Sequence, residues 1–353
     1  MTADRSSRRR TVRGVIWTVA VLVAVILAGL GYVYARLNGN LSGVDINAQL
    51  GSHRPANVDN GSEDILVLGS DSRAGSNAEY GRSTGARSDT AMVVHVFKGH
   101  KKASVVSIPR DTLVARPACA GKKGRTAPAA PSAMFNSAYE VGGPACAVKT
   151  VERMTGIRMD HYIEVDFTGF KKLINQLGGV KVTTTKAIHD KDSHLNLAPG
   201  THTLDGEQAL GLVRTRHAVG DGSDLGRIQL QQAFIKALIH QVRGVGVFSD
   251  PKKLFDLADT ATKSITPDSQ LDSVDKLIGF TGSLQNLSSQ DVTMITLPVK
   301  YDPSDPNRVV PLEPGARTVW NALRQDRPIP RSATKGSAGD TTGDANGVIK
   351  SAH

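Results

Sequence analysis

The sequence has 353 residues, of which 39% are hydrophobic and 22% are charged. A chain of this size and composition can bury a hydrophobic core, which excludes wholesale disorder, and it has room for one large domain or two ordinary ones. Forty-three Lys and Arg residues against 33 Asp and Glu residues give a net charge of +10 at pH 7. Such an excess favours an anionic partner: a nucleic acid, a membrane surface or a phosphorylated ligand.

The first 35 residues combine a basic segment with an uncharged apolar run. Five arginines precede the run, at positions Arg5, Arg8, Arg9, Arg10 and Arg13. Residues 14–35 are long enough to cross a bilayer, which takes roughly 20 residues of helix, and too long for an ordinary signal peptide. Because basic residues stay on the cytoplasmic side, the pattern predicts a cytoplasmic segment at 1–13, a helix through the cell membrane at 14–35 and an extracytoplasmic remainder. This topology argues against a nucleic-acid partner. The alternative interpretation of residues 14–35 is a buried helix of a soluble protein.

Beyond the anchor we expect a polar stalk at 36–63, one domain at 64–330 and a disordered tail at 331–353, which has almost no large apolar residue. Short runs rich in β-branched residues predict strands at 65–69, 91–97, 103–109, 161–165, 179–183, 212–216 and 292–298. Helical patterns lie between them; Asp166 is a favourable N-cap for one helix, and Asp205 with Gln208 resembles a capping box. These elements predict an α/β (α+β) fold with a mixed central sheet flanked by helices.

The two cysteines, Cys119 and Cys146, both follow the predicted transmembrane helix. An even number of cysteines in an oxidising compartment predicts one disulfide, and two buried thiols are the alternative. No pattern of paired Cys and His residues indicates zinc. The sequence HDKDSH at 189–194 is expected to be an exposed hairpin rather than a metal site.

Three predicted strand ends carry clustered charge. Asp71 and Arg73 follow the first strand, Arg87 and Asp89 lead into the second, and Arg110 follows the third. Loops at the ends of rigid strands are common places for functional sites. Mg²⁺ held by the two aspartates, with the arginines facing a polyanion, would balance these charges. The alternative is that the aspartates only cap their own turns.

A second charged group lies downstream. Arg214 and Arg216 alternate along the predicted strand at 212–216, so both are expected on one face. Asp224, Arg227 and Gln231 are spaced three and four residues apart, which places them on one side of a helix. Arginine binds phosphate with two parallel hydrogen bonds, so the arginine bias favours a phosphate ligand. A solvated helix face with a local Asp224–Arg227 pair is the alternative.

Eight motifs, in their order and spacing, resemble the LytR-CpsA-Psr family: GSDSR, GARSDT, SIPRDT, NSAYEVGG, TGIRMDHYIEVDFTGF, LGGV, LDGEQALGLVRTRH and DLGRIQLQQ. The likeness is strong over about residues 64–242 and looser to about residue 327. It implies a membrane-anchored phosphotransferase of the cell envelope. Such an enzyme moves a teichoic-acid-like or arabinogalactan-like glycopolymer from a polyprenyl-pyrophosphate carrier to a muramic acid hydroxyl of peptidoglycan, forming a phosphodiester.

The same resemblance implies roles for individual residues. Asp71 and Asp89 would hold Mg²⁺ (or Mn²⁺), and Arg110 would contact the pyrophosphate. The residues expected to join Arg110 there are Arg214, Arg216 and Arg227, with Asp224 and Gln231 at the family's remaining polar positions. Either Asp89 or Asp224 is the candidate to accept the proton of the acceptor hydroxyl. A gap between the sheet and the helices at 167–177 and 228–242 is our hypothesis for the lipid tail, with ordinary core packing as the alternative.

Two other functions stay open at this point. A hydrolase would cleave polyprenyl pyrophosphate at the same site without a sugar acceptor. A non-enzymatic envelope protein would bind an anionic polymer through its basic exported surface.

Overall fold

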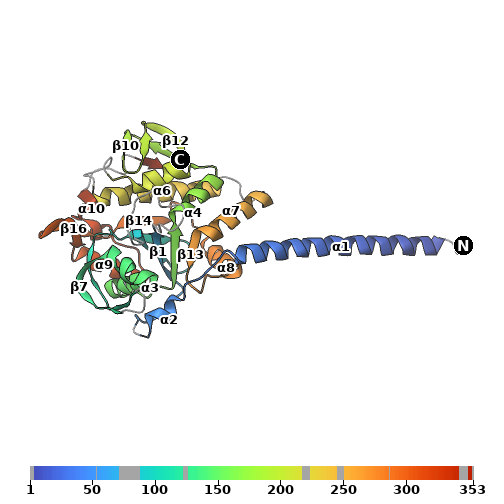
Figure 1. Cartoon of the computed structure of the whole chain (residues 1–353), viewed down its shortest axis with the longest axis horizontal. Helices are drawn as coiled ribbons and strands as arrows, with labels where there is room; N and C mark the ends of the chain where they lie inside the picture. Colours follow the sequence, from blue (N-terminus) through green and yellow to red (C-terminus); the bar gives the residue numbers. More distant parts are fainter. Residues whose placement is uncertain are drawn as a thin grey trace.

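A six-stranded mixed sheet forms the centre of the computed structural model (Figure 1). Its strands, in spatial order, are β13 (Ile265–Pro267), β8 (His161–Asp166), β1 (Glu63–Ser70), β2 (Ser88–Val96), β3 (Ala103–Ser107) and β14 (Val292–Thr296). The β1–β8 and β3–β14 pairs are parallel, and the other three pairs are antiparallel. The mixed central sheet expected from the sequence is confirmed.

The structure describes residues 4–52, 54–70, 88–121, 126–216, 223–244, 250–285, 287–341 and 349–351. For residues 4–16, 88–89, 341 and 349–351 it describes the backbone alone.

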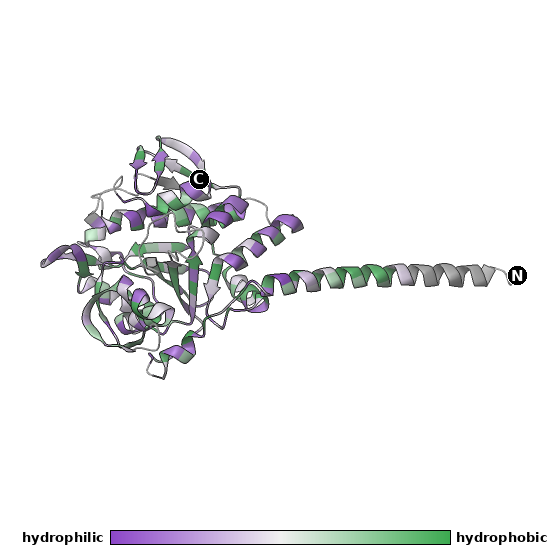
Figure 2. Ribbon diagram, in the orientation of Figure 1, coloured by the Kyte–Doolittle hydropathy of each residue, from purple (hydrophilic) through white to green (hydrophobic). Residues whose placement is uncertain are grey.

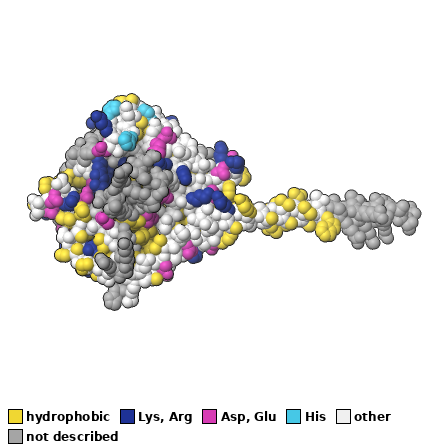
Figure 3. Space-filling model, in the orientation of Figure 1, with side chains coloured by type: hydrophobic (Ala, Val, Ile, Leu, Met, Phe, Trp, Pro, Cys, Tyr) yellow, Lys and Arg dark blue, Asp and Glu magenta, His cyan; other side chains and the backbone are white. Residues whose placement is uncertain are grey.

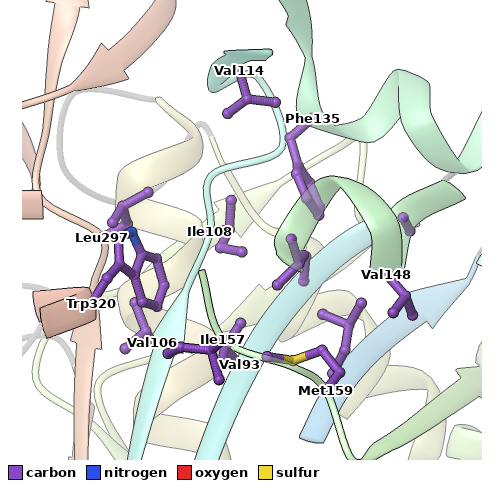
Figure 4. Close-up of a cluster of buried hydrophobic side chains, with 14 of the residues drawn as sticks. Val93, Val106, Ile108, Val114, Phe135, Val148, Ile157, Met159, Leu297 and Trp320 are labelled. Atoms are coloured by element: carbon purple, nitrogen blue, oxygen red, sulfur yellow. The ribbon is translucent and has the colours of Figure 1, made fainter. Parts of the chain in front are cut away.

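One face of the sheet is a closed core against α3 (Phe135–Thr155) and α9 (Gly315–Arg324) (Figure 4). Leu66, Val93 and Val106 stand on three neighbouring strands, and none of them is exposed to solvent. Phe135 from α3 and Trp320 from α9 pack into the same cluster. Each large side chain buried in this way contributes about 1.5–3 kcal/mol, so this face fixes the sheet firmly against the two helices.

The opposite face is apolar but less completely covered. Ile65 and Met92 point to this side, because neighbouring residues of a strand alternate between faces. The face is covered by α6 (Asp224–Gly244) and α8 (Val274–Leu284), whose Ile235, Ile239 and Phe280 are only partly buried. Apolar side chains between the sheet and these helices therefore retain access to solvent.

A smaller lobe packs on the other side of α6. It comprises α4 (Phe167–Gln176), α5 (Gly206–Arg214), β9 (Val180–Thr184), β10 (Ile188–Asp190), β11 (Leu195–Leu197), β12 (Gly200–Leu204) and β17 (Ile349–Ser351). Asp166 caps α4 by accepting a hydrogen bond from the Gly169 amide, and Asp205 and Gln208 form the expected capping box of α5. Leu230 and Phe234 of α6 are buried in this lobe, so α6 is packed on two sides.

Helix α1 (Asp4–Asn38) projects from the domain as a single rod (Figure 1). Its residues Trp17–Asn38 form a stretch that is long and apolar enough to cross a membrane (Figure 2), and apart from Leu37 at its end these residues are not buried in the domain. The end of α1 is held by α7 (Pro251–Ser264) and α8: Asn40 donates to Asp259 (2.9 Å), and Tyr34 donates to Asp275 (3.2 Å). Helix α1 and the domain therefore meet at α7 and α8.

The predicted stalk is wrong as a description of residues 36–63. Helix α2 (Ile46–Leu50) lies against α3, with Ile46 and Leu50 each 4% exposed. Nε of Arg54, four residues further on, donates to Glu152 Oε1 (3.0 Å). The spacing of Ile46 and Leu50, four residues apart, puts both on one helix face, which buries itself on the domain.

The first part of the segment at 331–353, which was expected to be disordered, is folded onto the domain. Residues 331–334 form a 3₁₀ turn (Arg331–Thr334), followed by the short helix α10 (Ala338–Thr341). Ala333 is 4% exposed within the main core, and the Ser337 hydroxyl accepts a hydrogen bond from the Val299 amide (3.1 Å). Small side chains can fill a tight core position, and composition alone does not reveal that.

Small antiparallel pairs complete the fold. They are β4 (Leu113–Arg116) with β7 (Ala130–Met134), β5 (Cys119–Ala120) with β6 (Thr126–Ala127), and β15 (Val299–Asp302) with β16 (Asp305–Pro311). Cys119 of β5 is bonded to Cys146 of α3, so the disulfide expected from the sequence is confirmed. The disulfide joins the segment from β4 to β7 to α3, the helix that covers the sheet.

Candidate active site

A pocket of about 490 Å³ lies where the chain leaves β3 and where α6 begins. One wall carries charged side chains from Arg110, Asp111, Arg216 and Asp224. The β15–β16 hairpin forms another part of the lining and contributes Tyr301, Asn307, Arg308 and Val309. The volume of the pocket lies within the range of about 300–1,000 Å³ that is usual for small-molecule sites.

The turn after β3 presents Arg110 to the pocket. Pro109 accepts hydrogen bonds from the backbone amide (3.0 Å) and the hydroxyl (2.6 Å) of Thr112, which closes a turn around Arg110 and Asp111. The Arg110 carbonyl accepts from the Asn136 amide at the start of α3 (3.0 Å). Arg110 is thus held between the sheet and α3, while its side chain is 20% exposed.

Asp224 joins two of the predicted arginines. Its Oδ2 accepts from the Arg110 backbone amide (3.3 Å), and its Oδ1 lies 3.6 Å from Arg110 Nε. The same oxygen is in an ion pair with the Arg227 guanidinium, whose side chain is only 3% exposed. Asp224 is the first residue of α6, where a negative charge also interacts favourably with the helix dipole. The structure therefore brings Arg110, Asp224 and Arg227 together as the sequence predicted.

Arg216 reaches the pocket by a different route from the one expected. The predicted strand at 212–216 is wrong, because helix α5 runs to Arg214 and the chain becomes extended only afterwards. The Arg216 amide donates to Asp190 Oδ2 (3.0 Å), and Asp190 Oδ1 accepts from the Asp192 and Ser193 amides at 2.9 and 3.1 Å. The hairpin expected at 189–194 is present as β10–β11, and its buried Asp190 positions the backbone of Arg216.

Two predicted binding residues flank the pocket without lining it. Arg214 ends α5 with its guanidinium carbon 5.4 Å from the centre of the Phe167 ring, a cation–π contact. Gln231 is 4% exposed, and its amide nitrogen donates to the Thr90 hydroxyl (3.0 Å) and the Val213 carbonyl (2.9 Å). Gln231 thus ties α6 to β2 and α5 just behind Arg227.

The predicted metal residues are less completely described. Asp71, Arg73 and Arg87 lie outside the described residues, and Asp89 is described by its backbone in β2 only. Ser70 is paired with Ser88 in the β1–β2 register, and Asp71 and Asp89 follow these two residues directly in the sequence. The Ser70 hydroxyl is buried without a hydrogen-bond partner among the described residues. The expectation that Asp71 and Asp89 hold Mg²⁺ therefore concerns two carboxylates whose positions lie outside the described side chains.

A protonated tyrosine pair lies near the end of β1. Tyr139 donates to Glu164 Oε1 and Tyr162 donates to Glu164 Oε2, both at 2.7 Å. Burial, followed by the nearby Glu164 carboxylate, raises the pKa of both phenols above their ordinary value. Both hydroxyls therefore stay donors at neutral pH, and they hold Glu164 in place.

The residues of the β15–β16 hairpin that line the pocket were not predicted from the sequence. Asp111 stands inside the SIPRDT motif but was not singled out, and Tyr301, Asn307 and Arg308 lie in a region with only a loose family likeness. A usable signal existed: Asp, Pro, Ser and Asn residues at 302–307 are flanked by β-branched residues, which is typical of a hairpin.

Comparison with known proteins agrees with this architecture. The model of the LytR_cpsA_psr family matches residues 33–325. The cell wall biosynthesis protein LcpA of Corynebacterium glutamicum is 33% identical over 333 residues, covering 85% of this chain and 62% of LcpA. The polyisoprenyl-teichoic acid–peptidoglycan teichoic acid transferase TagT of Bacillus subtilis is 31% identical over 306 residues, covering 82% of this chain and 89% of TagT.

A solved structure of TagT with bound octaprenyl pyrophosphate lipid superposes with a TM-score of 0.54 at 26% identity, covering 81% of this chain and 98% of TagT. The chain spans less than two thirds of the length of LcpA. The family model covers most of the chain, from the end of α1 through α9. The chain therefore belongs to the LytR_cpsA_psr family.

Proposed function

We propose that this protein transfers an anionic glycopolymer from a polyprenyl-pyrophosphate carrier to peptidoglycan. The observation that carries the proposal is the cluster of Arg110, Asp224 and Arg227 in a domain that follows an apolar helix. Arg110 and Asp224 of this cluster line one pocket with Arg216. TagT is a polyisoprenyl-teichoic acid–peptidoglycan teichoic acid transferase, and its structure holds octaprenyl pyrophosphate lipid; both support the same substrate class for this chain.

The chemistry follows from charge. When a phosphodiester forms from a pyrophosphate, negative charge is spread over the non-bridging oxygens in the transition state. Donors that are already positioned for this charge lower the barrier, and in such reactions they supply most of the catalysis. Arg110 and Arg216 line the pocket and would contact the diphosphate, while the buried Arg227 adds positive charge from behind.

Asp224 is best assigned to positioning. One of its oxygens accepts from the Arg110 amide, and the other faces the guanidinium groups of Arg110 and Arg227. Its lone pairs are thus directed at the arginines that the reaction needs, which leaves Asp89 as the candidate to accept the acceptor's proton. We also propose that Asp71 and Asp89 hold Mg²⁺, which when bound would neutralise phosphate charge.

The lipid tail needs an apolar path toward the membrane. The sheet face that carries Ile65 and Met92 is covered by partly buried side chains of α6 and α8, whereas the opposite face is closed. Because α8 also contacts the end of α1, a chain lying between the sheet and α6 would lead toward the anchor. The accessible apolar face supports the hypothesis that the polyprenyl tail lies there.

The direct test is Arg110→Ala in the full-length protein, reconstituted in nanodiscs with a polyprenyl-pyrophosphate glycan and a peptidoglycan oligomer. Loss of one positioned charged donor is expected to lower transfer by about 10²–10³-fold. The matched control is Arg317→Ala, which removes an exposed arginine on α9 that pairs with nearby Glu313 and does not line the pocket. The mass of the product separates the alternatives: glycan phosphate joined to peptidoglycan indicates a transferase, and free glycan phosphate indicates a hydrolase.

Transfer by Arg110→Ala at the rate of the control would refute the proposal. A polymer-binding protein without catalysis would form neither product, and its binding would weaken with salt for both variants alike. On the described part of the face in view in Figure 3, basic and acidic side chains are interspersed.

A further inference from the structure

Large hydrophobic side chains reach solvent at few places on the described part of the domain. Outside α1, only four of the described residues expose one: Val58, Leu254, Ile278 and Tyr301. Leu254 and Ile278 belong to α7 and α8, the two helices that hold the end of α1. Ile278 is 65% exposed, the highest value of the four. The proposed mechanism gives no role to either side chain.

Helix α8 carries apolar side chains on two sides. After its third residue the helix has no charged side chain, since residues 277–284 read LIGFTGSL. Phe280 packs toward the sheet, and Ile278 is turned about 200° away from it around the helix axis. At Gly279 and Gly282, nothing lies within 4 Å of the position where a side chain would begin. A helix that is apolar on two sides is expected to be covered on both, and the described residues leave the outer side of α8 open.

A contact with α1 fixes the level of this outer side. Tyr34 lies within the apolar stretch Trp17–Asn38 and donates to Asp275 Oδ1 (3.2 Å). Ile278 follows Asp275 by three residues, so the two side chains are neighbours on one side of α8. Tyrosines near the ends of a membrane-spanning helix favour the boundary between headgroups and acyl chains. The outer side of α8 therefore lies at the level of that boundary.

Helix α7 extends toward the same boundary. Asn40 donates to Thr262 (3.0 Å), and Arg36 Nε lies 3.3 Å from Asp259 Oδ1. Residue numbers therefore fall in the same direction along both helices, toward the apolar stretch of α1. Leu254 is five residues before Asp259, about 7.5 Å further along α7, and it is 40% exposed. Figure 1 shows α7 leaning out of the domain on the side where α1 leaves it.

The charges beside these apolar side chains are balanced. Three lysines of α7 and α8 each form an ion pair with a nearby aspartate: Lys252 with Asp256, Lys263 with Asp259, and Lys276 with Asp272. A surface with paired charges has little attraction for a strongly anionic partner. Its contact with a partner is therefore expected to depend on the apolar side chains, with the lysine stems lying along the apolar surface and their ammonium groups in water.

We propose that the outer side of α8, together with Leu254 at the start of α7, inserts into the headgroup–acyl boundary of the bilayer that α1 crosses. This inference goes beyond the proposed function, because it rests on α1 spanning a membrane and not on glycan transfer. The contact fixes the rotation of the domain about α1. The accessible sheet face that α8 covers is then held toward the bilayer.

The experiment uses the full-length protein at one copy per nanodisc, with a polarity-sensitive fluorophore on one introduced cysteine. The two natural cysteines are bonded to each other, so only the introduced thiol is labelled. Ile278→Cys is compared with Val58→Cys, because Val58 is 61% exposed and lies beside α9, which covers the opposite sheet face. In neutral phosphatidylcholine, spin-labelled lipid should quench the probe at position 278, and aqueous iodide should quench only the probe at position 58.

A second pair of variants tests the apolar character of the contact. The fluorophore is placed on Leu254→Cys, and Ile278→Asp is added. Burial of one isoleucine favours the docked state about ten- to a hundredfold. Ile278→Asp should therefore lower the ratio of docked to undocked protein by at least about tenfold and reduce lipid quenching at position 254. The matched control, Val58→Asp, should leave that quenching unchanged.

Three results would overturn the inference. Equal lipid quenching at positions 278 and 58 would show that α8 does not enter the bilayer. Quenching that appears only with anionic lipids would show that charge, not apolar insertion, makes the contact. Protection of the 278 probe from iodide without lipid quenching would assign the outer side of α8 to a protein contact. None of these measurements involves glycan transfer, so failure of the proposed function would leave them unaffected.

Discussion

Asp224→Asn removes the carboxylate that Arg110 and Arg227 share, and the structure allows the cost to be stated. Arg227 is 3% exposed and Asp224 is 12% exposed. Removing one partner of a buried ion pair leaves the other charge uncompensated and typically costs about 3–5 kcal/mol. For a domain of this size that corresponds to a fall in apparent Tm on the order of 10 °C. Because Arg110 also loses one of its two carboxylate partners, we also expect transfer to fall about 10²-fold.

The matched control is Asp111→Asn. Asp111 Oδ2 lies 3.4 Å from Arg110 Nε, but the two side chains are 21% and 20% exposed. A pair this open to solvent contributes only about 0–1 kcal/mol, so the same substitution should leave Tm nearly unchanged. Thermal unfolding and transfer are measured on both variants in nanodiscs. Equal shifts in Tm for the two variants would refute the reasoning that burial of Arg227 makes Asp224 essential.

Two further outcomes concern stability away from the pocket. His95 is buried between Asp64 (2.8 Å) and Asp326 (3.1 Å); burial lowers its pKa, but these two carboxylates outweigh burial and raise it above the ordinary value. The stability that protonated His95 contributes is therefore complete below about pH 6.5 and is lost as the pH rises through its raised pKa. Tm should fall from pH 6 to pH 9 in the wild type, and it should fall less in His95→Gln. An equal dependence of Tm on pH in the two proteins would contradict this. Replacing both Cys119 and Cys146 with Ala should lower the free energy of unfolding by about 3–4 kcal/mol, measured by chemical denaturation against the oxidised wild type; equal values would show that the disulfide does not limit the unfolded chain.

The charged core of the site could be predicted because its signals are local. Arg110 directly follows a predicted strand, and Asp224 and Arg227 are three residues apart at a helix start, so each was visible as polar residues at the end of an element. Arg110 and the Asp224–Arg227 pair come together because the end of β3 and the start of α6 lie at the same edge of the sheet. The strands of the sheet could be predicted from their runs of β-branched residues.

Other features depend on contacts that a sequence does not display. Residues 212–216 carry Val213 and Thr215 and look like a strand, but the capping box at Asp205 starts a helix whose Leu212 is fully buried. Packing of that helix against α4 and α6 outweighs the local β propensity. The β15–β16 hairpin belongs to the site only through the bridge between Thr112 and Val309, almost 200 positions apart in the chain.

Helix α6 gives the strongest physical reason to expect a lipid-borne substrate rather than a soluble one. Its first turn holds Asp224 and Arg227 at the pocket, and Ile235 and Ile239 further along cover the accessible sheet face. Twelve residues separate Arg227 from Ile239, about 18 Å along the helix. The far end of α6 is tied to α8, where Arg243 donates to the Gln285 carbonyl (2.8 Å), and α8 contacts the anchor α1. A soluble phosphate ester would use only the first turn of α6, whereas a charged head with an apolar tail would use the pocket, the apolar sheet face and the path toward α1.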